Sequence, residues 1–83
     1  MGTRVAIIGI IVEKPDNIEK LNQIFSKYSQ YIIGRMGIPY RAKDINVISI
    51  VIDAPQDVIS AMSGSIGKLD GISSKTAYSN VIS

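Results

Sequence analysis

Residues 34–41, which read Gly-Arg-Met-Gly-Ile-Pro-Tyr-Arg, hold the densest group of side chains that could bind a ligand. The arginines supply planar donors that suit a carboxylate or a phosphate, and the glycines allow close approach to the backbone. A structural interpretation stays open, in which the glycines form bulges, Pro39 ends a strand and the arginines are solvated. The segment is no phosphate loop or dinucleotide fingerprint, because no helix follows it. The candidate ligand residues here are Gly34, Arg35, Gly37, Tyr40 and Arg41.

Two carboxylates form the next candidate pair. Glu13 and Asp53 each end an aliphatic run, and we expect them at equivalent ends of neighbouring central strands. Paired carboxylates could perform acid–base chemistry or hold a hard cation. The simpler interpretation is that each ends a strand and favours the N-terminus of the following helix. Without a third ligand, the sequence does not support a metal site.

The residue types that are absent exclude much chemistry. The 83 residues contain no Cys, so there is no disulfide, thiol nucleophile or cysteine-ligated zinc or iron–sulfur cluster. They contain no His either, which removes the usual general base near neutral pH and the commonest metal ligand. Serines and lysines are frequent in the last third, but no spacing selects a Ser–Lys dyad. We therefore expect neither enzymatic activity nor a cofactor.

The charge balance and hydropathy limit the partners. Nine basic and seven acidic residues give a net charge of +2, too small to favour nucleic acid or a membrane surface. The longest apolar run, residues 5–12, is too short to span a bilayer, and no signal-peptide pattern is present. A cytoplasmic protein without direct nucleic-acid binding is expected. A hydrophobic content of 46% is generous for such a small chain and favours burial against another subunit.

The elements that must position these residues follow from an internal repeat. Residues 7–18 match residues 47–58: each copy has an aliphatic run, an acidic residue, a proline two places later and then a helical pattern. A duplicated strand–helix–strand unit predicts the order βαββαβ. The expected fold class is therefore α+β, a four-stranded antiparallel sheet with two helices on one face, in one domain of residues 1–83.

Local patterns give the expected element boundaries. Strands are predicted over residues 4–13, 31–38, 45–52 and 72–78, with a polar connection over 39–44. Helices are predicted from about 16 to 28 and from Pro55 to about residue 69. Asp16 is predicted to cap the first helix, with Glu19 in the capping-box position.

Side-chain alternation in the two central strands predicts two different sheet faces. One face carries large aliphatics that should lie under the helices: Ile8, Ile10, Val12, Ile48, Ile50 and Ile52. The other face is also apolar, with small residues at its centre, although a monomer would expose it to water. We therefore expect a homo-oligomer, a dimer or tetramer, joined through this second face. Its predicted interface residues are Ile7, Gly9, Ile11, Val47, Ser49 and Val51.

Three segments, residues 4–13, 31–41 and 48–55, resemble the iron-only hydrogenase system regulators, small bacterial proteins of ferredoxin-like, ACT-like fold. The fold is also similar to the C-terminal domain of nickel-responsive repressors. The resemblance implies a non-enzymatic transcriptional regulator associated with the hydrogenase system. It does not extend to nickel sensing, because the repressor site needs His and Cys.

The resemblance also implies a second ligand patch. In ACT domains, small ligands bind at the subunit interface near the turn between the first strand and the first helix. The corresponding residues here are Glu13, Lys14, Asp16 and Asn17, and the implied ligand is an amino acid or a similar small metabolite. The alternative is a structural or assembly module that binds another protein by its exposed sheet edge and takes no small ligand.

Overall fold

The computed structural model describes residues 2–82, and the side chains of residues 2–80. Its helices and strands are β1 (Arg4–Val12), α1 (Ile18–Lys27), β2 (Ile32–Tyr40), β3 (Ile45–Ala54), α2 (Gln56–Gly67) and β4 (Ile72–Ile82). Short 3-10 turns occupy Pro15–Asn17, Ser29–Tyr31 and Arg41–Lys43. The predicted βαββαβ order is confirmed. Neither helix of this described part is long and apolar enough to span a bilayer.

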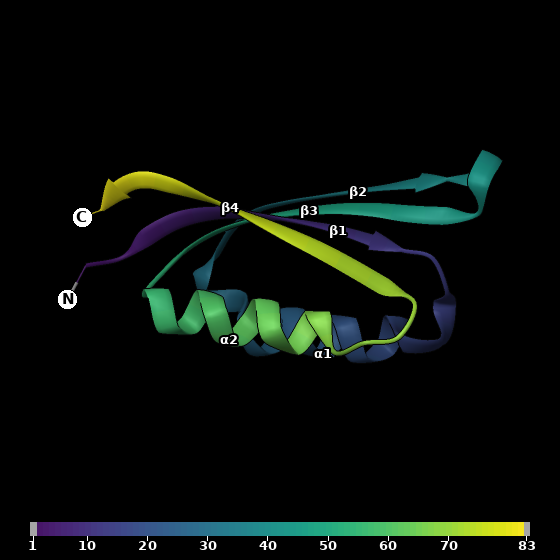
Figure 1. Cartoon of the computed structure of the whole chain (residues 1–83), viewed down its shortest axis with the longest axis horizontal. Helices are drawn as coiled ribbons and strands as arrows, with labels where there is room; N and C mark the ends of the chain where they lie inside the picture. Colours follow the sequence, from purple (N-terminus) through teal and green to yellow (C-terminus); the bar gives the residue numbers. More distant parts are fainter. Residues whose placement is uncertain (1, 83) are drawn as a thin grey trace.

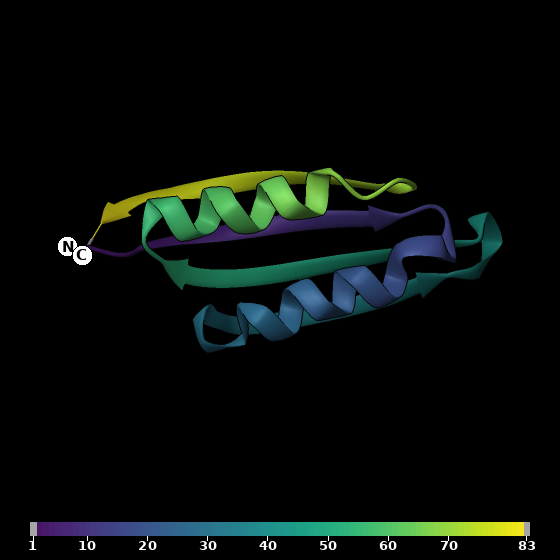
Figure 2. The same cartoon turned by 90° about the horizontal axis from the view of Figure 1, so that it is seen from below.

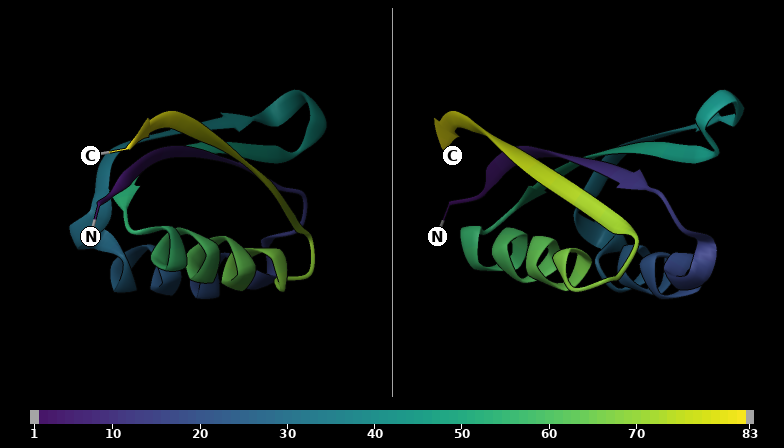
Figure 3. Two further views of the ribbon diagram at one scale, coloured as in Figure 1. Left: turned by 60° about the vertical axis from the view of Figure 1, so that its left-hand side comes forward. Right: turned by 45° about the vertical axis from the view of Figure 1, so that its right-hand side comes forward.

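The four strands form one antiparallel sheet in the order β2-β3-β1-β4. Both helices cover the same face of this sheet, and no element of residues 2–82 covers the other face (Figure 1). Seen from the helix side, α1 lies along the half formed by β2 and β3, and α2 along the half formed by β1 and β4 (Figure 2). The oblique views show the strong twist of the sheet above the two helices (Figure 3). The predicted two-layer architecture is therefore confirmed.

The internal repeat has a direct counterpart in the strand register. Gly9 and Ser49 are forty positions apart, so they occupy the same place in the two copies, and they pair with each other in the β1–β3 ladder. An antiparallel ladder that pairs repeat-equivalent residues has an approximate two-fold axis at that pair. The Gly9–Ser49 pair is therefore the centre of the duplicated scaffold.

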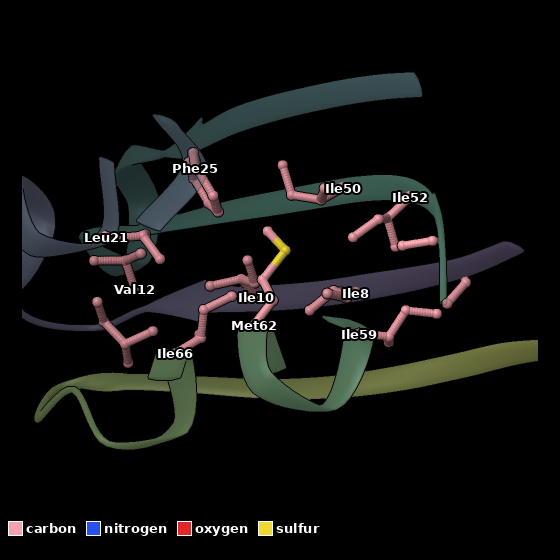
Figure 4. Close-up of a cluster of buried hydrophobic side chains, with 13 residues drawn as sticks. Ile8, Ile10, Val12, Leu21, Phe25, Ile50, Ile52, Ile59, Met62 and Ile66 are labelled. Carbon is pink, nitrogen blue, oxygen red and sulfur yellow. The ribbon is translucent and has the colours of Figure 1, made fainter. Parts of the chain in front are cut away.

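The core lies between the sheet and the helices and is wholly aliphatic and aromatic among the described residues (Figure 4). Its largest members are Ile8, Ile10, Leu21, Phe25, Ile50, Ile52, Ile59, Met62 and Ile66. Ile48, predicted to be fully covered, is only half-buried. It pairs with Gly37 on the neighbouring strand, which offers no side chain to pack against it.

Strand β2 is longer than predicted and runs through Pro39 to Tyr40. The predicted polar connection over residues 39–44 is wrong at its start, and it shrinks to a tight turn. Proline is accepted there because β2 is an edge strand and pairs only with β3 among the strands of this sheet. Asp44 closes the turn in the left-handed conformation, with φ of 54°.

The predicted capping box at the first helix is wrong. The chain forms the turn Pro15–Asn17 first, and Asn17 is the residue that precedes α1, without a side-chain capping bond. Instead, Asn17 Nδ2 donates a hydrogen bond to the Asp70 carbonyl oxygen at 3.0 Å. The side chain next to the helix start is used to hold the α2–β4 turn.

Candidate ligand site

A pocket of about 220 Å³ opens on the helix side of the sheet, between α1 and the edge strand β2. Gly37 explains the opening, because a Cβ atom built there would meet no atom within 4 Å. Aliphatic side chains form the inner wall of the pocket: Val12, Ile18, Leu21 and Ile48. Its polar side chains are Asn22 of α1, Arg35 of β2 and Asn46 of β3. The pocket thus combines an apolar wall with one cation and two carboxamides.

Arg35 is an exposed residue whose guanidinium lies over an aromatic ring. Its register partner is the buried Ile50, which places Arg35 on the helix side of the sheet. Its guanidinium carbon lies 4.6 Å from the centroid of the Phe25 ring, and Phe25 itself is only 2% exposed. Stacking uses the flat face of a guanidinium and leaves its N–H edge available. Among the described residues no carboxylate forms an ion pair with Arg35.

The pleat of β2 divides the first predicted ligand patch. Arg35 and Gly37 lie on the helix side, at the pocket, whereas Gly34 and Tyr40 pair on the opposite face with Val51 and Ile45. The reason is the two-residue period of a strand. Arg41 lies in the turn beyond the strand end. Five residues that are close in sequence therefore do not form one cluster.

The second predicted patch, at the β1–α1 turn, forms hydrogen bonds with the α2–β4 turn. The backbone N–H groups of Glu13 and Lys14 both donate to the Gly71 carbonyl oxygen, at 2.7 and 3.2 Å. Lys14 Nζ also lies 3.8 Å from a carboxylate oxygen of Asp70. A hollow of about 90 Å³ borders Glu13 and Lys14. This hollow shares Val12 and Asn46 with the Arg35 pocket, so the two predicted patches adjoin at these residues. Asp16 is exposed and lines neither cavity.

Glu13 and Asp53 do lie at the C-terminal ends of neighbouring central strands, but they do not meet, so the alternative of a functional carboxylate pair is wrong. Asp53 pairs with Val5 near the start of β1, and Glu13 follows the end of the same strand. Eight residue steps separate Val5 from Glu13, or about 27 Å at about 3.4 Å per step. Because β1 and β3 are antiparallel, the ends of their aliphatic runs lie at opposite ends of the sheet. The two acids cannot act on one substrate atom or share one cation.

The helix-free face of the sheet, which we call the sheet back, carries the six predicted interface residues. Ile7 is 47% exposed and Val47 is 38% exposed, both high for large aliphatics. Gly9 and Ser49 form the low centre of this face, beside a shallow hollow of about 270 Å³. Met36 and Ile38 extend the apolar area onto β2, and Met36 is 59% exposed. Met36 and Ile38 alternate with Arg35 and Gly37 along β2, and this two-residue period would have predicted both apolar side chains on the sheet back.

Asn22 and Asn46 are also absent from the predicted site. Asn22 lies on the polar side of α1, and Asn46 is the second residue of β3. Neither position carries a local signal. Asn22 reaches the pocket only because α1 docks onto the sheet, and Asn46 lines it only because β3 pairs with β2, where its partner is Pro39. No sequence pattern at either position could have indicated this meeting.

The strand order, the single covered face and the pocket beside α1 define a ferredoxin-like α+β protein with a candidate ligand site on its helix side. The chain belongs to the family described as "TM1266-like: Iron-only hydrogenase system regulator, putative", whose model matches residues 4–76.

Solved structures agree with this assignment. The structure of uncharacterized protein TM1266 from Thermotoga maritima is similar with a TM-score of 0.87 and 28% identity, over 92% of this chain and 96% of that one. A formyltetrahydrofolate deformylase from Pseudomonas putida KT2440 shares the fold alone, with a TM-score of 0.67 and 10% identity. That match covers 93% of this chain and 29% of the deformylase chain. No curated protein gives a match.

Proposed function

We propose that the protein is a non-enzymatic regulatory module of the iron-only hydrogenase system, a cytoplasmic homo-oligomer that senses a small ligand and acts on transcription. Family membership supports the regulatory part. The Arg35 pocket supports ligand sensing, because it offers an apolar wall and an unpaired cation. The observation that carries the homo-oligomer is the apolar sheet back, which no element of residues 2–82 covers.

The size of the sheet back suits a second copy of the chain. Four strands about 4.8 Å apart, with about eight residues at about 3.3 Å each, give a projected area of about 500 Å². Projecting side chains make the accessible area larger than the projected area. A standard interface removes about 800 Å² of accessible surface from each partner. The projected area of the sheet back is thus about three fifths of that figure before the relief of its side chains is counted, which is compatible with a dimer interface.

The shape of the sheet back also suits self-association. A two-fold interface brings the same patch of both subunits together. Here the low Gly9–Ser49 centre lies in a row with the protruding Met36, so the high point of one copy can fill the low point of the other. On the outer strand β4, Lys75 is the register partner of Gly9 and provides a polar rim. Such a contact leaves the Arg35 pocket, on the other face, open to solvent.

The test combines sedimentation velocity with cysteine cross-linking. The chain contains no Cys, so any covalent dimer must form through an introduced one. Ser49→Cys places a nearly isosteric thiol at the centre of the sheet back, and Ser26→Cys places one on the exposed surface of α1. We expect the wild-type protein to sediment as a dimer or tetramer. A thiol reagent with two reactive groups about 10 Å apart, the usual separation of packed sheets, should cross-link Ser49→Cys much faster than Ser26→Cys.

Two results would count against this arrangement. A wild-type protein that sediments as a monomer contradicts the homo-oligomer and favours the alternative, an assembly module that binds another protein by its exposed sheet edge. An oligomer in which Ser26→Cys cross-links as fast as Ser49→Cys keeps the homo-oligomer but contradicts the sheet back as its interface.

A further inference from the structure

We propose that the Arg35 pocket selects a small aliphatic carboxylate and discriminates against an amino acid of the same carbon skeleton. The inference rests on the ligand-sensing part of the proposed function and names the class of ligand. Three properties of the pocket carry it: a donor edge oriented toward the pocket, the absence of a partner for an ammonium group, and an aliphatic wall of limited length.

The first property is the position of Arg35. Arg35 is an exposed residue, but its guanidinium carbon lies 4.6 Å from the centroid of the buried Phe25 ring, and this contact favours an orientation toward the pocket. A planar fork of N–H groups matches the two oxygens of a carboxylate, and charge-assisted bonds of this kind are among the strongest hydrogen bonds in proteins. An arginine whose orientation is already favoured also loses less entropy when the ligand binds. The pocket is thus prepared for one carboxylate.

The second property is the set of side chains around Arg35. Among the described residues that line the pocket, none is an acid; Glu13 and Asp44 line the adjoining hollow instead. Asn22 and Asn46 can donate to a carboxylate or accept from a neutral group, but neither carries the negative charge that a buried ammonium needs. Desolvating an ammonium without a charged partner is costly. An amino acid would therefore lose affinity relative to the plain carboxylate.

The third property is the size of the apolar part. The pocket has a volume of about 220 Å³ and is open to solvent on one side. Val12, Leu21 and Ile48 line this volume and favour a short aliphatic chain over a polar one. A second carboxylate at the far end of a ligand would lie against these aliphatic side chains. The wall therefore also disfavours a dicarboxylate.

The test uses four probes on the full chain. 4-Methylpentanoate, leucine and 3-methylbutylamine share one branched skeleton and carry the carboxylate, both charged groups and the amine, respectively; pentanedioate is the dicarboxylate. Binding is measured by calorimetry and by the NMR signals of the side-chain amides of Asn22 and Asn46. We expect 4-methylpentanoate to bind at least about tenfold more tightly than leucine, from the cost of leaving an ammonium unpaired. The amine should not bind.

Two single-charge variants separate the site from net charge. Arg35→Gln should weaken 4-methylpentanoate binding by at least about tenfold, because it removes a charge-assisted pair and keeps much of the side-chain length. Lys68→Gln removes the same charge from an exposed residue beyond α2 and should leave binding unchanged. If both variants weaken binding equally, the effect is one of net charge and the pocket assignment is overturned.

The outcomes also separate this inference from the proposed function. If leucine or pentanedioate binds as tightly as 4-methylpentanoate and Arg35→Gln removes that binding, the pocket senses a ligand but the proposed class is wrong. If none of the four probes shifts the amide signals or releases heat, the proposal of a small carboxylate is overturned. The cross-linking experiment on the sheet back is unaffected by either result.

Discussion

Gly71 packs directly against Lys14, and this contact joins the α2–β4 turn to the β1–α1 turn. A Cβ atom on Gly71 would lie 2.6 Å from Lys14 Cβ, closer than real Cβ contacts come. Gly71 also has φ of +79°, a conformation that side chains rarely adopt. Its carbonyl oxygen accepts the hydrogen bonds from the backbone of Glu13 and Lys14. The two turns therefore fit together only because residue 71 has no side chain.

Gly71→Ala should lower the free energy of unfolding by more than about 1–2 kcal/mol. The left-handed conformation alone costs about that much for a residue with a Cβ, and the overlap with Lys14 adds to it. Gly64→Ala in α2 is the matched control, because a Cβ there meets nothing within 4 Å. The control should raise stability by up to about 1 kcal/mol through helix propensity. Urea unfolding measures both, and equal shifts for the two variants would contradict the assignment.

Asp70→Asn should change the free energy of unfolding by less than about 0.5 kcal/mol. The variant removes the ion pair between Asp70 and Lys14. The Lys14 side chain is 60% exposed and the Asp70 side chain is 85% exposed. It keeps the Asp70 backbone carbonyl that accepts from Asn17. Exposed pairs are screened by water and salt, so the backbone contacts should hold the turn. A loss comparable with that of Gly71→Ala in the same urea assay would show that the ion pair matters more than its exposure indicates.

Ile7→Lys combined with Val47→Glu should convert the protein to a monomer that keeps its fold. Both residues lie on the sheet back and are substantially exposed within one chain, so the charges cost little in the monomer but would be buried in the dimer. Sedimentation velocity reports the mass and far-UV circular dichroism reports the fold. An unchanged oligomeric mass and melting point would contradict an interface at the sheet back.

Ile50→Ala should destabilise the protein by about 2–5 kcal/mol, because it leaves a cavity in a close-packed core. Ile50 is fully buried between the sheet and the helices, near Met62 (Figure 4). Met62→Leu keeps nearly the same volume at an equally buried position and should cost less than about 1.5 kcal/mol. Thermal unfolding of both variants tests this, and similar losses would mean that the core is not tightly packed.

Much of the fold could be predicted because its signals are local. The alternation around Gly9 and Ser49 predicts the strands and the two faces of the sheet, and Leu21 and Phe25 recur at helical spacing. The errors arose where long-range contacts overrode local rules. Asp16 was predicted to cap α1, but Asn17 precedes the helix and its side chain donates a hydrogen bond to the α2–β4 turn. Strand β2 continues through Pro39 because an edge strand needs no hydrogen bond on its outer side.

The candidate site was only partly predictable. Arg35 was identified from its chemistry, but the pleat separates it from Gly34 and Tyr40. Glu13 and Asp53 looked like a pair because they match in the repeat, yet antiparallel pairing places them at opposite ends of the sheet.

The sequence by itself determined the duplicated βαββαβ scaffold, its apolar core and the apolar sheet back, since all three depend on the two- and 3.6-residue periods of neighbouring side chains. Only the tertiary structure decided which polar groups meet. Phe25 and Asn22 come to the Arg35 pocket from α1, and Asn46 lines the same pocket from β3. Their meeting depends on how α1 docks on the sheet, and docking is set by the packing of the whole core.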